Sequence, residues 1–221
     1  MFITLGNYKI SSYLPADKES KQVVYLHMPE GGAEAVWNLT NQRFALIVIE
    51  GVDWNRELSP WYHEKVFPKG EDFAGEADKY LAFFTEQLIP EIERTYGLSP
   101  KERYLAGYSL AGLFAVYAMY HTSLFNGIAS ISGSLWYDGF ADYVKTHVIG
   151  QNPDKIYFSL GDKEAVSARG IMQTVLTYTE QIVKLLQSND RSVTFEMNEG
   201  NHFKNVPERI AKGINWLTET S

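Results

Sequence analysis

The chain of 221 residues contains no cysteine. This absence excludes disulfide bonds, thiolate metal sites and a cysteine nucleophile. The sequence also lacks the zinc-binding H-E-x-x-H motif, the phosphate-binding G-x-x-x-x-G-K-[ST] motif and the dinucleotide-binding G-x-G-x-x-G motif. We therefore expect no catalytic metal.

Basic residues are also fewer than acidic ones. The chain has 20 Lys and Arg and 27 Asp and Glu, which gives a net charge of −7. A nucleic-acid-binding protein usually has a basic surface, so we expect no nucleic-acid partner. The segment 1–8 lacks the charged and long apolar parts of a secretory signal, so we expect a cytoplasmic location. The length favours a single domain over residues 1–221. The oligomeric state stays open.

Charged residues are absent between Tyr104 and Tyr137, so hydropathy alone could suggest a membrane span. Polar and turn-forming residues at 121–123 and 126–127 interrupt the stretch before it reaches the ~20 apolar residues that a span needs. It divides into strand, helix and strand, which is typical of parallel strands buried on both faces. We therefore predict the middle of a sheet, and no membrane partner.

Strand and helix patterns alternate along the chain, which predicts an α/β fold with a mostly parallel central sheet between helical layers. Strands are predicted at 22–28, 44–49, 103–106, 128–131, 156–160 and 193–197, after one or two edge strands within 2–14. Helices are predicted at 33–39, 78–96, 110–120, 171–185 and 207–217. Pro90 should kink or break its helix. The segment 52–78 is predicted to be a long irregular loop, and such loops are often functional.

Ser109 lies in the segment Gly107-Tyr108-Ser109-Leu110-Ala111-Gly112, between a predicted strand and a predicted helix. This is the layout of a nucleophile elbow, a tight turn from which a serine hydroxyl projects. Small residues around the serine let the strand and helix backbones approach each other. Taken alone, the motif also fits a buried strand–turn–helix whose serine caps the helix.

Two further loops at strand ends complete the pattern. Asp162 and Glu164 follow the strand at 156–160, and His202 follows the strand at 193–197. The chain order serine, acid, histidine is that of α/β-hydrolases. Chemically, an imidazole activates the serine hydroxyl, and a carboxylate orients the imidazole. The pattern thus predicts a serine hydrolase, with Asp162 and Glu164 both open as the acid, since Asp162 could instead cap a turn.

The same chemistry needs donors for an oxyanion. One should be the backbone N–H of Leu110, which directly follows the serine. The second should come from the loop after the strand at 44–49, at the N–H of Val52.

With these residues in place, the chain resembles the putative esterase family of α/β-hydrolases. That family includes S-formylglutathione hydrolase, the enterobactin and salmochelin esterases, and mycolyltransferases. The resemblance extends from about Tyr25 to the end. The similar segments are 50–54 (D-G-x-x-W, with Glu for Asp), 56–60 (R-E-L-S-P, similar to R-x-x-L-T-P but one residue shorter), 107–114 (the elbow), 132–136 (S-G-S-x-W), 161–164 (G-x-x-[D/E]) and 200–202 (G-x-H). The resemblance implies an α/β-hydrolase fold and an acyl-serine intermediate without a cofactor, and it favours Glu164 over Asp162.

We therefore predict a carboxylic-ester hydrolase that acts on a small-molecule ester. Arg56 is a candidate for holding an anionic part of the substrate, with a surface ion pair as the alternative. Trp54, Trp61 and Trp136 are candidates for pocket walls, with core packing as the alternative. An acyltransferase with the same triad and a non-catalytic binding protein of the same fold are the alternative functions.

Overall fold

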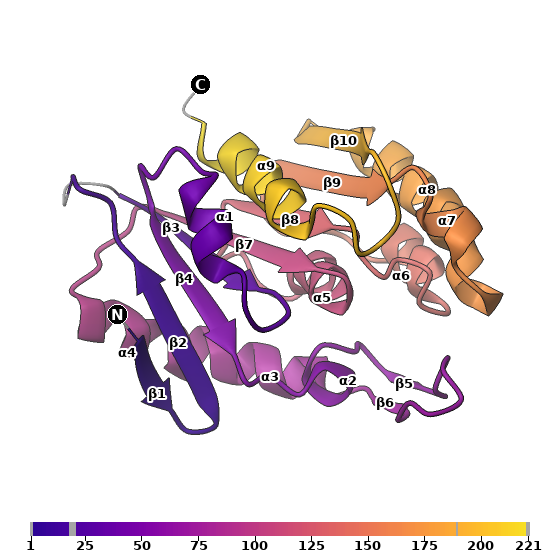
Figure 1. Cartoon of the computed structure of the whole chain (residues 1–221), viewed down its shortest axis with the longest axis horizontal. Helices are drawn as coiled ribbons and strands as arrows, with labels where there is room; N and C mark the ends of the chain where they lie inside the picture. The colour runs from indigo at the N-terminus through magenta and orange to yellow at the C-terminus, as the bar shows by residue number, and fades with distance from the viewer. Residues whose placement is uncertain (1, 18–20, 189, 220–221) are drawn as a thin grey trace.

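The computed structural model describes residues 2–17, 21–188 and 190–219, which form layers around one eight-stranded sheet (Figure 1). Its strand order is β1-β2-β4-β3-β7-β8-β9-β10. β1 and β2 form an antiparallel edge hairpin, β2 pairs antiparallel with β4, and the pairs from β4 to β10 are all parallel. The strands are Phe2–Leu5 (β1), Tyr8–Tyr13 (β2), Gln22–His27 (β3), Ala45–Glu50 (β4), Glu102–Tyr108 (β7), Gly127–Ile131 (β8), Lys155–Gly161 (β9) and Ser192–Asn198 (β10).

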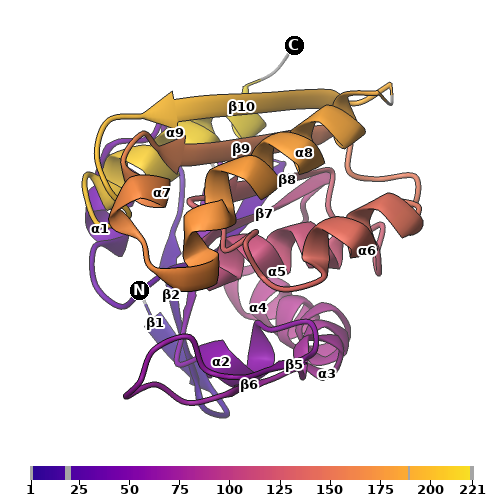
Figure 2. The same ribbon diagram turned by 90° about the vertical axis from the view of Figure 1, so that its right-hand side faces the viewer.

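Helices cover both faces of the sheet (Figures 1 and 2). One face carries α1 (Ala33–Asn38) and α9 (Val206–Thr218), and the other carries α3 (Ala77–Phe83), α4 (Ile89–Tyr96), α5 (Leu110–Ala118), α6 (Phe140–Thr146) and α8 (Val175–Gln187). Strand side chains alternate between two cores, because successive residues of a strand point to opposite faces. In β3, Val23 and Tyr25 join one core, and Val24 and Leu26 join the other. The predicted three-layer arrangement around a mostly parallel sheet is confirmed.

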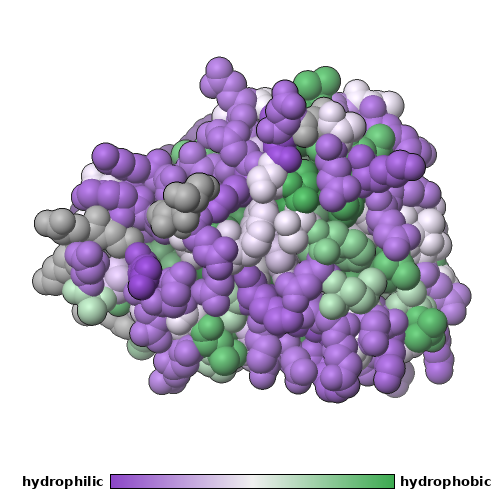
Figure 3. All heavy atoms as spheres, turned by 90° about the horizontal axis from the view of Figure 1, so that it is seen from above, coloured by the Kyte–Doolittle hydropathy of each residue, from purple (hydrophilic) through white to green (hydrophobic). Residues whose placement is uncertain are grey.

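The stretch without charged residues, 104–137, lies in the middle of the sheet and of the helical layer beside it. β7 and β8 pair in the interior of the sheet, and α5 between them is buried along its whole length. Within the described ranges, no helix is long and apolar enough to cross a membrane. The face seen in Figure 3 is mostly hydrophilic, with hydrophobic residues gathered in smaller patches.

The segment 52–78 contains more regular structure than we predicted. A short helix, α2 (Trp54–Glu57), begins after Asp53, whose carboxylate accepts a hydrogen bond from the N–H of Arg56. A small hairpin then joins β5 (Tyr62–His63) and β6 (Phe73–Ala74). Two-residue strands are too short for an alternating pattern to be visible in the sequence.

Two predicted helices are interrupted, and a helix of seven residues, α6, was missed in addition to the four-residue helices α2 and α7 (Glu164–Ser167). A π-helical turn at Phe84–Leu88 lies between α3 and α4, directly before the first turn of α4, which contains Pro90; the backbone stays helical through the proline, so the helix is irregular there without being broken. The helix predicted from 171 begins instead as a 3₁₀ turn at Gly170–Thr174, which leads into α8. The missed helix, α6, buries Phe140 and Val144 in the core.

Candidate active site

Ser109 occupies the sharp turn between β7 and α5. Its backbone angles, φ 59° and ψ −121°, lie where residues other than glycine are rarely found. The turn is possible because Gly107 has no side chain: a Cβ there would lie 2.0 Å from the carbonyl oxygen of Ala111. The sequence therefore builds the geometry of a nucleophile elbow, in which the strained serine projects from the edge of the sheet.

Parallel pairing brings three loops to that edge. β7, β8, β9 and β10 are successive parallel neighbours, so their carboxyl ends meet on the same side of the sheet. Ser109 follows β7, Glu164 opens α7 (Glu164–Ser167) shortly after β9, and His202 follows β10. Residues that are far apart in the sequence thus become neighbours.

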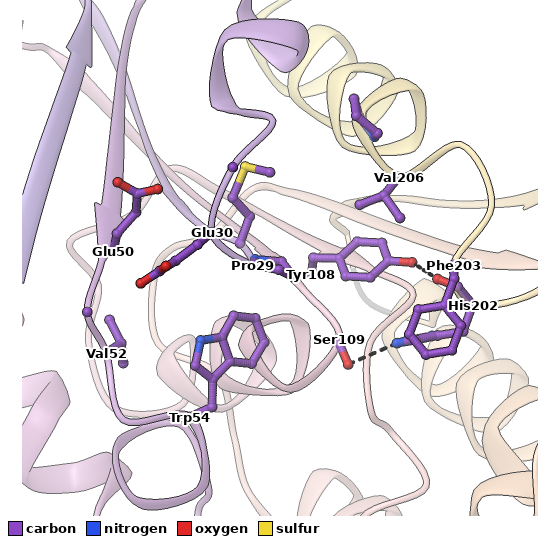
Figure 4. A pocket seen from close by; sticks show the side chains of 14 residues that line it. Pro29, Glu30, Glu50, Val52, Trp54, Tyr108, Ser109, His202, Phe203 and Val206 are labelled. Atoms are coloured by element: carbon purple, nitrogen blue, oxygen red, sulfur yellow. Dashed lines mark hydrogen bonds between the residues drawn. The ribbon is translucent and has the colours of Figure 1, made fainter.

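A hydrogen-bonded chain connects these three side chains. His202 Nε2 lies 3.0 Å from Ser109 Oγ, and His202 Nδ1 lies 2.8 Å from Glu164 Oε2 (Figure 4). A carboxylate only accepts hydrogen bonds, so Nδ1 carries the proton and donates to Glu164. The other nitrogen, Nε2, is then free to accept the hydrogen bond of the Ser109 hydroxyl.

Glu164 is almost completely enclosed, with 4% of its side chain exposed. Its Oε1 atom accepts hydrogen bonds from Ser132 Oγ (2.7 Å), the N–H of Gly161 (2.6 Å) and Arg209 Nη1 (2.8 Å). Burial alone would raise the pKa of this carboxyl, but the hydrogen bond and charge of His202, together with the donors Ser132 and Gly161, hold the pKa below its usual value. The carboxylate is therefore ionised when it accepts from His202.

Arg209 on α9 connects this carboxylate to the histidine loop, the segment 199–205 between β10 and α9. Its side chain is 1% exposed, and its Nη2 donates to the carbonyl oxygens of Glu199 (3.0 Å) and Asn201 (2.9 Å). Sequence reasoning missed this residue, because it belongs to no motif. The one signal was a charged residue next to the apolar positions of a predicted amphipathic helix.

Tyr108 also holds the histidine loop, since its hydroxyl donates to the backbone carbonyl of His202 (Figure 4). Burial raises the pKa of Tyr108, so the hydroxyl keeps its proton and remains a donor. The imidazole is thus positioned through its own ring and through its backbone.

Asp162, the alternative acid, has a different partner. Its Oδ1 atom accepts the N–H of Gly200 at 2.6 Å. The structure therefore brings Glu164 to His202, and it uses Asp162 to fix the start of the histidine loop.

Two cavities meet at Ser109. The larger has a volume of about 740 Å³, and the smaller has a volume of about 200 Å³. The larger is lined by Met28, Pro29, Glu30, Gly31, Glu50, Gly51, Val52, Trp54, Tyr108, Ser109, His202, Phe203, Val206 and Pro207 (Figure 4). The smaller is lined by Trp54, Asn55, Val66, Phe67, Gly70, Glu71, Phe73, Ser109, Leu110, Ser134 and Trp136. Trp54 lines both cavities, and Trp136 lines the smaller one.

Arg56 takes the second of the two roles that the sequence left open. It lines neither cavity, its side chain is 55% exposed, and it pairs with Asp53 (3.4 Å) and Glu76 (3.6 Å). The structure therefore shows the surface ion pairs, and it does not place Arg56 at the substrate cavities. Trp61 is likewise outside both cavities and packs against Tyr137.

The two predicted oxyanion donors lie on the walls of these cavities. Val52 lines the larger cavity and Leu110 the smaller, and neither backbone N–H has an acceptor among the described residues. Gly51 directs the chain here, because its φ of 83° suits glycine and a Cβ would lie 2.5 Å from the carbonyl oxygen of Asn7.

The part of the chain that the structure describes contains no group of three or more His, Asp or Glu able to hold a metal ion. Histidines other than His202 have structural neighbours; for example, His27 is buried against Tyr80. Burial lowers the pKa of His27 to about 3, so this ring stays neutral in the core.

Comparison with known proteins shows the family and the fold of the chain. A family model described as "Putative esterase" matches residues 4–203. The protein YbbA of Bacillus subtilis (strain 168), itself described as uncharacterized, is 26% identical over 235 residues, which covers 96% of this chain and 93% of YbbA. The siderophore hydrolase EstA from Aspergillus nidulans superposes with a TM-score of 0.75 at 19% identity, covering 95% of this chain and 89% of EstA. An IroE-like serine hydrolase from Shewanella oneidensis superposes with a TM-score of 0.77 at 19% identity, covering 95% of this chain and 75% of that hydrolase. The predicted α/β-hydrolase fold is confirmed.

Replacing Arg209 by Met should lower the free energy of unfolding by about 3–5 kcal/mol, because it leaves a buried carboxylate without its cationic partner. Urea denaturation followed by tryptophan fluorescence measures this change. The matched control is Arg94→Met, which removes an exposed pair with Glu91 and should change stability little. Equal losses in the two variants would contradict the buried network described above.

Glu164 should also make stability depend on pH. Its pKa in the folded protein lies below the ordinary value of 4.5, so its charge stabilises the fold above that value, and the stabilisation is lost as the pH falls through the lower folded pKa. In Glu164→Gln, the free energy of unfolding should therefore fall less steeply than in the unaltered protein between about pH 5 and pH 3. Urea denaturation at a series of pH values measures this free energy. If it changes with pH equally steeply in Glu164→Gln and in the unaltered protein, Glu164 is not the group responsible.

Proposed function

The chain belongs to the putative esterase family and is a carboxylic-ester hydrolase, and we propose that Ser109, His202 and Glu164 are its catalytic triad. The observation that carries the proposal is the continuous chain of hydrogen bonds from Ser109 Oγ through His202 to the buried carboxylate of Glu164. Each group has the partner that its role requires, because the nucleophile contacts a base and the base contacts an ionised orienting acid.

Acylation begins when Ser109 Oγ attacks the ester carbonyl carbon and His202 Nε2 takes the hydroxyl proton. The carbonyl double bond opens to an oxyanion, and the imidazole becomes positively charged. Glu164 stabilises that charge through the hydrogen bond to Nδ1, and it keeps the ring in the required orientation. Its own low pKa leaves the proton on the imidazole.

The oxyanion is held by the N–H groups of Leu110 and Val52. Support for this assignment comes from two facts: both groups lack an acceptor among the described residues, and both residues line the cavities that meet at Ser109. Leu110 also begins α5, and the N-terminus of a helix favours a negative charge. Donors fixed in place before the reaction stabilise the charge that develops in the transition state.

The oxyanion then collapses, the bond to the alcohol oxygen breaks, and His202 Nε2 gives that oxygen its proton. The acyl group remains on Ser109. A water molecule attacks next, with His202 again taking a proton, and a second collapse releases the carboxylic acid and restores the serine hydroxyl. No group besides those of the protein and water is required by these steps.

The substrate proposed at this point is a small-molecule ester. One of the similar structures is described as a siderophore hydrolase and another as an IroE-like serine hydrolase, and at 19% identity the likeness shows the fold alone. Siderophore esters are therefore not part of the proposal.

Ser109→Ala should lower kcat for a short-chain p-nitrophenyl ester by at least about 10³-fold, because the variant has no nucleophile to form the acyl-serine. Release of p-nitrophenol measures the rate. Ser188→Ala is the matched control, since Ser188 caps the end of α8 and lines neither cavity; its rate should be unchanged. Turnover by Ser109→Ala close to that of the control would refute the assignment.

Alanine at Glu164 should lower kcat by about 10³–10⁴-fold, because the imidazole loses the group that sets its tautomer and stabilises its charge. Alanine at Asp162 should cost no more than about tenfold, because it removes only a hydrogen bond to the Gly200 N–H. The same p-nitrophenol assay compares the two variants, with thermal melting to verify folding. If kcat falls further in Asp162→Ala than in Glu164→Ala, Glu164 is not the triad acid.

A further inference from the structure

The two cavities at Ser109 differ in which catalytic groups they reach. His202 and Val52 line the larger cavity, whereas Leu110 lines the smaller, and His202 does not reach the smaller one. In Figure 4, Trp54 and His202 lie on opposite sides of Ser109. Trp54 and Ser109 line both cavities.

The chemistry of the proposed triad gives each cavity a different part of the ester. His202 must protonate the leaving alcohol oxygen, so that oxygen lies within hydrogen-bond reach of Nε2. The alcohol part therefore extends into the cavity that His202 lines. The acyl part is attached to the opposite side of the carbonyl carbon, and the smaller cavity is the one that remains for it.

We propose that the smaller cavity is the acyl pocket of this enzyme and that it selects short, uncharged acyl groups, while the larger cavity receives the alcohol part. The proposal rests on the triad function proposed above and adds the substrate class to it.

The walls of the smaller cavity have the right chemistry for such a group. Its inner wall is apolar, since Leu110 (6% exposed), Phe73 (6%) and Trp136 (8%) are all buried core residues. Among the described residues that line it, Glu71 is the one with a charge, so an anionic acyl group would find no cationic partner there. An apolar acyl chain, in contrast, would be removed from water by these rings.

The volume limits the length of the acyl group. About 200 Å³ corresponds to roughly six or seven water molecules at about 30 Å³ each, so an acyl group of about six heavy atoms would fill it. The larger cavity, at about 740 Å³, has several times that room. The alcohol part can therefore be considerably larger than the acyl part.

The outer wall comes from the connection between β5 and β6, in the segment that the sequence left without an assigned role. Val66, Phe67, Gly70 and Glu71 of this connection line the smaller cavity. Phe67 is 57% exposed and stands at the rim. The connection thus forms part of the wall of the acyl pocket, which gives this long segment a function in specificity.

The experiment measures kcat/KM for p-nitrophenyl esters that share one leaving group and differ in acyl length, from acetate through butyrate and hexanoate to dodecanoate. The unaltered enzyme should prefer butyrate or hexanoate, and dodecanoate should be at least about tenfold poorer, because its chain exceeds the cavity. A second series keeps the butyryl group and varies the alcohol from ethanol to p-nitrophenol and naphthol.

Three variants test the two cavities separately. Trp136→Ala enlarges the acyl pocket and should raise kcat/KM for dodecanoate relative to butyrate by about tenfold, with little change in the alcohol series. Phe203→Ala, at the rim of the larger cavity, should change the alcohol series and leave the order of acyl lengths as it was. Because truncating a buried tryptophan can impair folding, Phe67→Ala at the exposed rim is the second acyl-pocket variant, and it should also favour longer chains.

The outcomes separate this inference from the proposed function. A preference for short chains that relaxes in Trp136→Ala or Phe67→Ala supports the acyl pocket. If the unaltered enzyme turns over dodecanoate as well as butyrate, the acyl-pocket proposal is wrong, but the proposed triad is not affected. An acyl-length order that responds to Phe203→Ala and not to the other two variants assigns the cavities the other way round. Absence of turnover with every ester contradicts the triad function itself, and the acyl pocket with it.

Discussion

The burial of one negative charge, that of Glu164, is the constraint on which the site depends. A carboxylate that is 4% exposed is stable only when its oxygen atoms are fully hydrogen-bonded, and here Ser132, the Gly161 N–H and Arg209 share one oxygen while His202 takes the other. The same arginine also holds the histidine loop through two carbonyl oxygens. The charge that orients the imidazole is therefore also a structural centre that connects β8, β9, the histidine loop and α9.

The sheet supplies the rest of the geometry. Parallel neighbours place the ends of β7, β9 and β10 along one edge, and the absent side chain at Gly107 lets α5 approach closely enough to hold Ser109 in its strained turn. The three reactive groups are thus fixed by elements whose own stability comes from two apolar cores. The cavities, in contrast, are lined by the loops at the same edge, and the connection between β5 and β6 lines the smaller one, the proposed acyl pocket.

Much of the fold was predictable, because buried parallel strands leave uncharged, β-branched runs, and because the order of serine, acid and histidine requires no knowledge of contacts. The sequence could not choose between Asp162 and Glu164 from spacing alone, since the choice depends on which side chain turns inward after β9. It could not reveal Arg209, whose partners lie on other elements. It also left two roles open for Arg56, because the direction in which α2 turns that side chain, toward Asp53 and Glu76, cannot be read from the motif.

The central claim is that His202 activates Ser109 as a nucleophile, and covalent labelling tests it most directly. The protein is treated with a fluorophosphonate, which reacts with activated serine hydroxyls, and the adduct is located by mass spectrometry of the intact protein and of its peptides. The account predicts a single adduct on Ser109, formed at a rate that falls by at least about 10³-fold in His202→Ala. No adduct, an adduct on another residue, or labelling of Ser109 that is equally fast in His202→Ala would contradict it.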